Sequence, residues 1–391
     1  MRKLGVLMIV ALIASLMLGK LVVIGPWSGA EQEKFIPVLK AFEREYGIDV
    51  EYKVYRSEDL LKILPAQFKA KKSMADVIFM WSWFIQDQAK KGNVVNLTDV
   101  IKEDDFIPGA LDAVKVNGKI YGIVYTGKVK PGFWYRKSFF KKYGLKVPRT
   151  WQEFKDLLKK IKSIPGIKAP IASGDGVGWP LSDVTEHFLI TFGGPYVDKD
   201  LMAGNLKWES NTAKYAMGKL VELLKAGYFG EPTEWTMVLK QWWNGEYALY
   251  FMGSWITGMV DDPEDLGVFT LPGAKGVVFA ADYAFIPKYS KHIDEAKKLI
   301  KFLATEGQVV QVRQGGHIAT YKYTSLSDYP SVDREVAKIL QGMEALPDLD
   351  DTVGGAFQKA FWDQLKLLWV NPERFDEVLK VLDEKMAVTK K

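Results

Sequence analysis

Tryptophans that closely follow strand-like runs are the residues whose type and position best suit ligand binding. The apolar runs Leu21–Gly25, Ala75–Met80 and Glu246–Met252 are each followed within three residues by such a side chain. A flat indole ring can lie against the C–H face of a sugar, whose hydroxyls then need hydrogen-bond partners. A single tryptophan at a strand end is equally compatible with a core position, but the repetition favours a sugar site. These tryptophans are Trp27, Trp81, Trp83 and Trp255.

No arrangement of residues in the sequence indicates catalysis, and we predict no catalytic residue. No nucleophile-elbow motif is present. Paired carboxylates could serve glycoside hydrolysis, but solvated surface or helix N-termini explain most such pairs. A secreted glycoside hydrolase or other carbohydrate-active enzyme therefore stays as the alternative to a binding protein. The acid pairs are Asp183 with Glu186, Asp261 with Asp262, and Asp350 with Asp351.

Composition excludes several further classes of site. The 391 residues contain no cysteine and three widely spaced histidines, so a Cys-bound or multi-histidine metal site is not expected. The Gly-rich loop Ser173–Pro180 lacks the Lys-Ser or Lys-Thr pair of a P-loop. The net charge of +5 is small and mixed with acids, which does not indicate nucleic acid. We expect no cofactor, no metal and no nucleic-acid partner.

The amino terminus has the pattern of an export signal. Arg2 and Lys3 precede the apolar run Leu4–Leu18, which has about the length of a signal-peptide core and is shorter than the roughly 20 residues of a membrane span. We interpret residues 1–19 as a signal-peptide-like segment, either cleaved or retained as an anchor; a buried core helix is the alternative. The expected location is the periplasm or the extracellular face of the membrane.

The residues after this segment predict an α/β fold. Leu21–Gly25, Ile48–Val54 and Ala75–Met80 read as strands that alternate with amphipathic helices. Such alternation favours parallel pairing, because each crossover has room for a covering helix. The pattern indicates an open, doubly wound sheet, whose ligands bind beyond the carboxyl ends of the strands.

The stretch from Asn117 to Phe154 is where we expect the chain to cross between two lobes. Tyr125 to Pro131 should form a hinge strand, and its Tyr125 is a candidate for the sugar site. Thr150 and Glu153 predict a capping box that starts the next helix. The aromatic side chains of Trp134 and Trp151 are assigned to the core.

Short motifs follow one another along the chain in a characteristic order. Each is weak alone, but together they span nearly everything after the first 19 residues. In this order they resemble the extracellular sugar-binding proteins of ABC transporters, the family 1 solute-binding proteins that include the maltose-binding proteins. The motifs are Asp76-Val-Ile-Phe79, Asn117-Gly-Lys-Ile-Tyr-Gly-Ile123, Trp134-Tyr-Arg-Lys137, Thr150-Trp-Gln-Glu-Phe154, Asn244-Gly-Glu-Tyr-Ala248, Gly253-Ser-Trp255 and Leu271-Pro-Gly273.

The resemblance implies a two-lobed periplasmic-binding-protein-like (type II) fold, each lobe a mostly parallel sheet flanked by helices. Three crossings of the chain would form the hinge, with sugar held in the cleft between the lobes. The expected N-lobe comprises residues 20–127 plus 273–316, and the C-lobe residues 128–272 plus 317–391. Matched to the family's motifs, the sugar-binding residues are Trp27, Ser28, Trp81, Ser82, Trp83, Tyr125, Trp179, Asp183, Trp255, Asp282, Tyr283, Phe357 and Phe361.

The resemblance further implies a function in uptake. The protein would bind an oligosaccharide and deliver it to the permease subunits of an ABC transporter, acting as a monomer that reaches the membrane through the permease. An α-glucoside such as maltose, trehalose or a malto-oligosaccharide is the expected ligand, and β-linked glucans come next. Trp83 stands where the family has an acidic contact, so details of maltose binding do not transfer.

Overall fold

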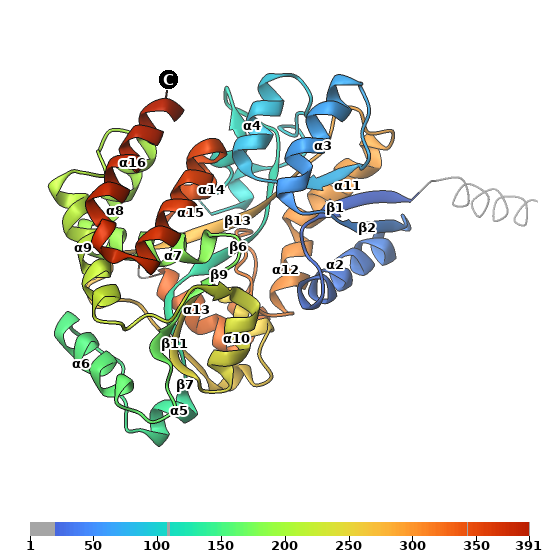
Figure 1. Ribbon diagram of the computed structural model, residues 1–391. Coiled ribbons are helices and arrows are strands. Elements are labelled where there is room, and N and C mark those ends of the chain that lie inside the picture. Colours follow the sequence, from blue (N-terminus) through green and yellow to red (C-terminus); the bar gives the residue numbers. More distant parts are fainter. Residues whose placement is uncertain (1–19, 108–109, 342, 391) are drawn as a thin grey trace, which may run out of the picture. The chain divides into compact units, whose positions relative to one another are not determined.

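A computed structural model of the protein describes residues 20–107, 110–341 and 343–390. The signal-peptide-like segment, residues 1–19, lies outside the described residues. No helix in the described part of the chain combines the length and the apolar character needed to cross a membrane. The described chain forms two compact units that we call unit 1 and unit 2, each with its own core (Figure 1). Of the described residues, unit 1 comprises those from 20 to Gly127 together with Ala281–Pro330, and unit 2 comprises those of Lys128–Ala280 and from Ser331 onward.

Unit 1 is built on a sheet whose central strand is β1. The strand β1 pairs in parallel with both β2 and β3, and β3 pairs antiparallel with the end of β13. The predicted parallel arrangement of the first three strands is thus confirmed. The strands are β1 (Leu21–Gly25), β2 (Val50–Val54), β3 (Val77–Phe79), β6 (Ile123–Lys130), which pairs with β13, and β13 (Gly276–Phe285), with a small hairpin of β4 (Lys115–Val116) and β5 (Lys119–Ile120).

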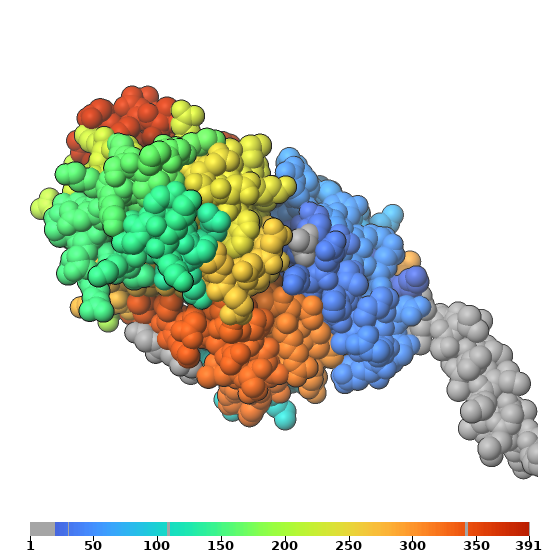
Figure 2. All heavy atoms as spheres, turned by 90° about the horizontal axis from the view of Figure 1, so that it is seen from below, coloured from blue at the N-terminus to red at the C-terminus, as the bar shows by residue number. Residues whose placement is uncertain are grey.

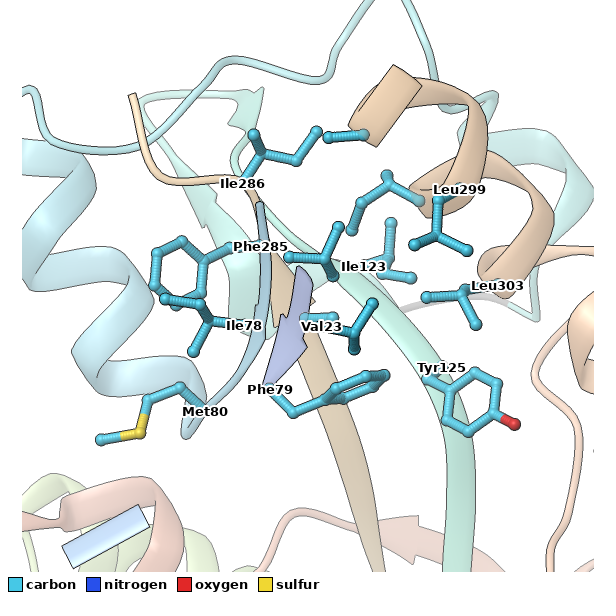
Figure 3. Close-up of a cluster of buried hydrophobic side chains, with 14 of the residues drawn as sticks. Val23, Ile78, Phe79, Met80, Ile123, Tyr125, Phe285, Ile286, Leu299 and Leu303 are labelled. Atoms are coloured by element: carbon cyan, nitrogen blue, oxygen red, sulfur yellow. The ribbon is translucent and has the colours of Figure 1, made fainter. Parts of the chain in front are cut away.

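Five helices belong to unit 1, and their apolar faces pack on this sheet because hydrophobic residues recur at helical spacing. In α3 the buried side chains Leu60, Leu64 and Phe68 follow that spacing. Figure 3 shows the resulting core, in which Val23 lies on the side of Leu299 and Leu303 from α11. Ile78 and Phe285 lie on the other side of the strands, where the ring of Phe285 is near that of Phe68 in α3. The helices are α2 (Ala30–Tyr46), α3 (Ser57–Lys69), α4 (Ser82–Lys90), α11 (Ile293–Ala304) and α12 (Glu306–Val312).

Unit 2 is built on a four-stranded sheet of order β12-β7-β11-β8. Two of its three strand pairs are antiparallel, since β7 runs opposite to both β11 and β12. The expectation of a mostly parallel sheet is therefore wrong for this unit. Apolar runs indicate that a segment is a buried strand, but tertiary pairing decides its direction. The strands are β7 (Gly132–Arg136), β8 (Ala169–Ala172), β11 (Tyr247–Met252) and β12 (Leu266–Phe269), with β9 (Gly174–Asp175), β10 (Thr233–Glu234) and β14 (Glu344–Leu346) outside this sheet.

Helices contribute most of the core of unit 2. Trp134, expected in the core, is fully buried, and Trp151 is half-buried and packs against the same core. The helices are α5 (Lys137–Lys142), α6 (Trp151–Lys162), α7 (Trp179–Phe188), α8 (Pro195–Ala203), α9 (Asn211–Lys225), α10 (Trp235–Trp243), α13 (Ser331–Gln341), α14 (Leu349–Val353), α15 (Gly355–Val370) and α16 (Phe375–Thr389).

The strands β6 and β13 and the segment around Pro330 carry the chain between the two units. The boundaries fall at residues 127–128, 280–281 and 330–331. The sequence-based expectation was 127–128, 272–273 and 316–317. The first boundary falls within β6, between residues 127 and 128. Tyr125 therefore belongs to unit 1, and Lys128 belongs to unit 2.

Candidate functional site

The loops after β1 and β3 bring several of the predicted site residues together in unit 1. These two strands are parallel neighbours, with Val23 opposite Val77 and Ile24 opposite Ile78. Both strands consequently end at the same edge of the sheet, where ligands of doubly wound sheets bind. Trp27 and Ser28 follow β1. After β3 come Trp81 and then Ser82 and Trp83, the first two residues of α4.

Trp27 is firmly held in its loop. Its ring lies 4.6 Å from that of Phe79 and 5.8 Å from that of Tyr125, between centroids. The Tyr52 hydroxyl accepts a hydrogen bond from the Trp27 N–H (3.0 Å) and donates one to the Trp27 carbonyl (3.1 Å). Only 4% of Trp27 is exposed, so it offers an edge rather than a full face to a ligand. Ser28 beside it is exposed.

A small cavity lies against Trp27. Tyr125 in its wall is fully buried and donates a hydrogen bond to the Gln311 side-chain oxygen at 2.7 Å. Burial raises the pKa of the Tyr125 hydroxyl well above its usual range, which keeps this donor protonated. The Gln311 side-chain nitrogen is buried and has no hydrogen-bond partner among the described residues, although buried amides are normally satisfied. The cavity is lined by Trp27, Glu31, Phe35, Tyr125, Gln311 and His317.

Trp81 and Trp83 form a pair of nearly parallel rings, with centroids 6.1 Å apart and an interplanar angle of 14°. Both are half-buried, as is Ser82, the first residue of α4. The Trp83 indole nitrogen is buried without a hydrogen-bond partner in the described chain. The pair therefore combines flat apolar surface with an uncommitted donor, which are the two features that a sugar requires.

Asp282 and Tyr283 on β13 lie beside these loops. The Tyr283 carbonyl accepts a hydrogen bond from the Met80 N–H at 3.0 Å, directly before the tryptophan pair. Burial, followed by the negative charge of Asp282, raises the pKa of the Tyr125 hydroxyl, so the carboxylate is near the cavity. Both side chains are half-buried. Unit 1 thus gathers an acid and several aromatic residues at one edge of its sheet.

Three tryptophans form a second group, in unit 2. Trp179 at the start of α7 lies 5.4 Å from Trp235 and 5.5 Å from Trp255, between ring centroids. Trp255, which is 8% exposed, also has the Lys128 ammonium 5.5 Å from its centroid, a cation–π geometry. The ring of Trp255 folds over Gly253, where an added Cβ would lie 1.8 Å from a ring carbon. We call Trp179, Trp235 and Trp255 the unit 2 tryptophan group.

Asp183, a predicted sugar ligand, is instead engaged in the interior of unit 2. It is 1% exposed and pairs with the buried Lys130, which pairs also with Asp348. Burial raises the Asp183 pKa to about 7, although Lys130 lowers it. The acids Asp183, Glu186 and Asp350 are all buried, so solvated surface, one of the two explanations expected for such pairs, does not apply to them. The other explanation, a helix N-terminus, fits Asp350, which lies in the first turn of α14. Asp183 is left out of the proposed site because its carboxylate is buried and bonded to Lys130.

Phe357 and Phe361 of α15 also lie in the core of unit 2. Both are fully buried and stack on each other with centroids 5.7 Å apart. Trp208 packs on the same pair, 5.2 Å from Phe361. Neither phenylalanine ring presents a face to a ligand in this structure, so a core role replaces the sugar-binding role expected for them.

A separate hollow on unit 2 does not have the composition of a sugar site. Its lining comes from the connection that follows α5 and from α6, and these residues belong to the blue-green part of the chain in Figure 2. None of the described residues that line it is aromatic, so it lacks the flat apolar faces against which sugars stack. Its lining consists of Gly144, Leu145, Lys146, Val147, Pro148, Arg149, Glu153, Asp156, Leu157 and Lys160.

Sequence reasoning missed two residues of these groups. Trp235 is the first residue of α10 and follows β10, a strand of only two residues that leaves no apolar run in the sequence. The pattern that found the other tryptophans therefore could not find it. Gln311 lies on α12, far from Tyr125 in the sequence. Only the folded chain brings this amide to the cavity, and no motif marks it.

The two α/β units, with aromatic side chains after their strands, define the fold class of two-lobed binding proteins of type II. Solved structures agree. A chitin oligosaccharide binding protein superposes with a TM-score of 0.81, 20% identity and coverage of 95% of this chain and 99% of that one. The maltotriose binding protein of Thermus thermophilus gives a TM-score of 0.75, 19% identity and coverage of 95% and 99%.

The family follows from the sequence. The model of the bacterial extracellular solute-binding proteins matches residues 27–310. An uncharacterised ABC transporter extracellular-binding protein of Pyrococcus horikoshii is 59% identical over 366 residues, which are 93% of this chain and 87% of that protein. The chain belongs to the extracellular solute-binding proteins of ABC transporters.

Membership in this family bears on several predictions. It confirms the resemblance seen in the sequence motifs and the two-lobed type II fold. The family consists of solute-binding proteins that act outside the cytoplasm, in the periplasm or at the cell surface, and not of enzymes. The hydrolase alternative is therefore set aside, and the predicted export of the protein is confirmed.

Proposed function

We propose that this protein binds an oligosaccharide and delivers it to the permease of an ABC transporter for uptake. The observation that carries the proposal is the unit 2 tryptophan group, in which the ring centroids of Trp235 and Trp255 both lie within 5.5 Å of that of Trp179. Aromatic rings in mutual edge contact form a rigid apolar surface, and sugars stack on such surfaces. The Trp81–Trp83 pair and the cavity beside Tyr125 offer a second set of contacts in unit 1.

The proposed ligand is an α-glucoside with two or more sugar rings, such as maltose, trehalose or a malto-oligosaccharide. Several tryptophans suit several sugar rings better than one. The choice of an α-glucoside rests on the maltose-binding-like motifs, and β-linked glucans are the second choice. Trp83 in place of an acid favours stacking over hydrogen bonding at that position.

The residues proposed to contact the sugar divide between the two units. In unit 1 the half-buried Asp282 supplies a carboxylate, which makes stronger hydrogen bonds to hydroxyls than a neutral acceptor does. In unit 2 the contacts are mainly aromatic. The proposed set is Trp27, Ser28, Trp81, Ser82, Trp83, Tyr125, Asp282, Tyr283 and Gln311 in unit 1, and Trp179, Trp235 and Trp255 in unit 2.

A thermal-shift screen of the purified protein against di- and trisaccharides tests the proposal. We expect one sugar class to raise the melting temperature in a concentration-dependent way, since a ligand that binds only the native state stabilises it. Titration calorimetry should then give micromolar affinity, about −8 kcal/mol. No shift with any sugar would contradict the proposal, and so would conversion of the sugar during the incubation, checked by chromatography.

Light scattering after size exclusion tests the proposal that the protein acts as a monomer. A mass near 44.2 kDa for the full chain, or somewhat less after removal of a signal segment, is the expected result. Co-purification with the permease in detergent, in the presence of the identified sugar, tests the delivery step. Absence of any association at saturating sugar would argue against that partner.

A further inference from the structure

A group of buried carboxylates in unit 2 lies apart from the tryptophan groups. It comes from three segments, namely α7 with Glu186, α8 with Asp198, and the start of α14 with Asp348 and Asp350 (labelled in Figure 1). Their exposed fractions are 0%, 0%, 5% and 1%. Buried acids are rare unless they are paired or coordinate a metal. We call these four residues the acid group.

Three of the four carboxylates converge on one point. One oxygen each from Glu186, Asp348 and Asp350 can be chosen so that all three lie within 4.8 Å of one another. The Ser182 hydroxyl lies 3.0 Å from Glu186 Oε1 and 2.7 Å from Asp350 Oδ1. A hydroxyl has one hydrogen, so it can satisfy only one of these two oxygens at a time.

Hydrogen-bond donors reach only part of the acid group. Lys130 pairs with the Oδ2 atom of Asp348, and it is shared with Asp183. Lys199, next to Asp198 in sequence, pairs with Glu344 instead. Neutral donors include Leu349 N–H to Glu186 Oε2 at 2.8 Å, and Trp362 Nε1–H and the Gln358 amide to Asp350 Oδ2 at 2.6 and 3.3 Å. The Asp348 carboxyl also has hydrogen bonds with the Asp351 backbone and the Asp350 side chain.

Three oxygens of the acid group have no hydrogen-bond partner within the described part of the chain. Both carboxylate oxygens of Asp198, and Oδ1 of Asp348, are buried and make no hydrogen bond to any described residue. The charges of Asp198 and Asp348 both act on Glu186, and that of Asp348 acts on Asp198, so these carboxyls are neighbours. Leaving a buried polar group unsatisfied costs about 1–3 kcal/mol, and more for a charged one. Such a group requires protons or a cation.

We propose that Glu186, Asp198, Asp348 and Asp350, together with the Ser182 hydroxyl, bind one calcium ion. The donors are all oxygens, which are the ligands of hard cations rather than of zinc. Calcium accepts six to eight oxygens in flexible geometry, whereas magnesium demands a near-ideal octahedron and usually keeps several waters. An almost fully buried set of carboxylates suits calcium better. The expectation of no metal, drawn from the missing cysteines and scarce histidines, considered only nitrogen and sulfur ligands.

The bound ion would connect segments that are distant in the sequence. Glu186 and Asp350 are 164 positions apart, yet one ion would tie α7 and α8 to α14. Burial raises the pKa of the Glu186, Asp198 and Asp350 carboxyls well above their usual range. The alternative to a cation is protonation of these carboxyls, and the two cases predict different experimental results.

Calcium content is the first measurement. Protein treated with EDTA, then dialysed against CaCl2 and finally against calcium-free buffer, should hold about one calcium per chain by mass spectrometry of metals. Its melting temperature should rise with CaCl2 and not equally with MgCl2. Tb³⁺ added in place of calcium reports the location of the site. Trp362 donates a hydrogen bond to Asp350, and excitation of an indole beside bound Tb³⁺ sensitises the emission of that ion. CaCl2 should compete this emission away.

Variants then assign the site. Asp350→Asn and Glu186→Gln should each lower the Tb³⁺ emission and the calcium content at least tenfold. The double variant Asp261→Asn/Asp262→Asn, at an exposed acid pair of the same unit, should change neither. If the variants do not fold, the wild-type measurements alone decide. Protein without calcium and with an unchanged melting temperature overturns the proposal, and so does calcium content that the variants retain.

Discussion

The indole rings of Trp179 and Trp255 meet edge to face, with centroids 5.5 Å apart and an interplanar angle of 67°. Aromatic pairs prefer this geometry, which contributes about 0.5–1.5 kcal/mol beyond the area buried. Trp179 makes a similar contact with Trp235, at 64°. Each ring therefore restrains the orientation of its neighbour, and the three form a preorganised surface, which lowers the entropic cost of binding a ligand.

Replacing Trp255 with Ala should weaken sugar binding more than tenfold, which is about 1.4 kcal/mol or more. The variant loses a stacking face and the ring that supports Trp179. Titration calorimetry with the sugar found by screening measures the change. Trp243→Ala is a matched control, because Trp243 contacts Trp242 and Arg136 and not the unit 2 tryptophan group. Equal affinity of the Trp255 variant and the wild type would remove Trp255 from the site.

Gly253→Ala should also lose affinity about tenfold or more, without any change to an aromatic residue. The added methyl would lie 1.8 Å from a ring atom of Trp255, so the ring must leave its present position. Binding is measured by calorimetry and folding by circular dichroism. Gly218→Ala is the control: Gly218 lies within α9 and its Cβ would meet no atom within 4 Å. That control should gain about 0.5–1 kcal/mol of stability and keep its affinity, and a Gly253 variant that binds normally would contradict the argument.

The sequence predicted the local elements of this fold well and their pairing less well. Leu21–Gly25 was expected as a buried strand and is one, because an apolar run of that length between a charged residue and a turn has few other solutions. The cap at Thr150 is present, with its hydroxyl accepting from the Glu153 N–H at 3.1 Å. The Glu153 carboxylate, however, accepts from the N–H of Arg149 and not of the cap residue. Strand direction in unit 2 depended on long-range contacts that no local pattern encodes.

For the candidate site, residue type was easier to predict than burial. Tryptophans after strands could be found because strand ends share one edge of a sheet. Phe357 and Phe361 match the family's motifs equally well but turn inward against Trp208. Asp183 likewise points to Lys130, a partner 53 positions away. Whether a side chain faces solvent or the core at such positions is decided by tertiary packing.

Lys130→Met should destabilise the protein by about 3–5 kcal/mol, the usual cost of removing one partner of a buried ion pair. The ammonium is buried between Asp183 and Asp348, and the variant leaves both carboxylates without it. Urea unfolding measures the difference. Lys338→Met, which removes an exposed pair with Glu335, should change stability by less than about 1 kcal/mol. A Lys130 variant as stable as this control would show that the carboxylates are protonated or otherwise neutralised in the folded state.

His187 should make the protein less stable as the pH falls. It is fully buried, and its Nε2 atom accepts a hydrogen bond from the Leu271 N–H at 3.0 Å. Burial lowers its pKa from 6.5 to about 3, so between these values the unfolded chain binds a proton that the folded chain does not. Linkage then lowers the free energy of unfolding by about 1.4 kcal/mol for each pH unit below about 6.5.

The measurement must separate this effect from that of the buried acids. The pKa of Asp183 is raised to about 7, so between about pH 4 and 7 the folded chain binds a proton there that the unfolded chain does not. Asp183 therefore increases the free energy of unfolding as the pH falls, which is opposite to the effect of His187. His187→Gln keeps an oxygen that can accept the Leu271 N–H but does not titrate. Urea unfolding of both proteins from pH 7 to 4.5 should show that the free energy of unfolding of the variant, relative to that of the wild type, increases as the pH falls. Parallel stability curves would mean that His187 titrates alike in the folded and unfolded chains.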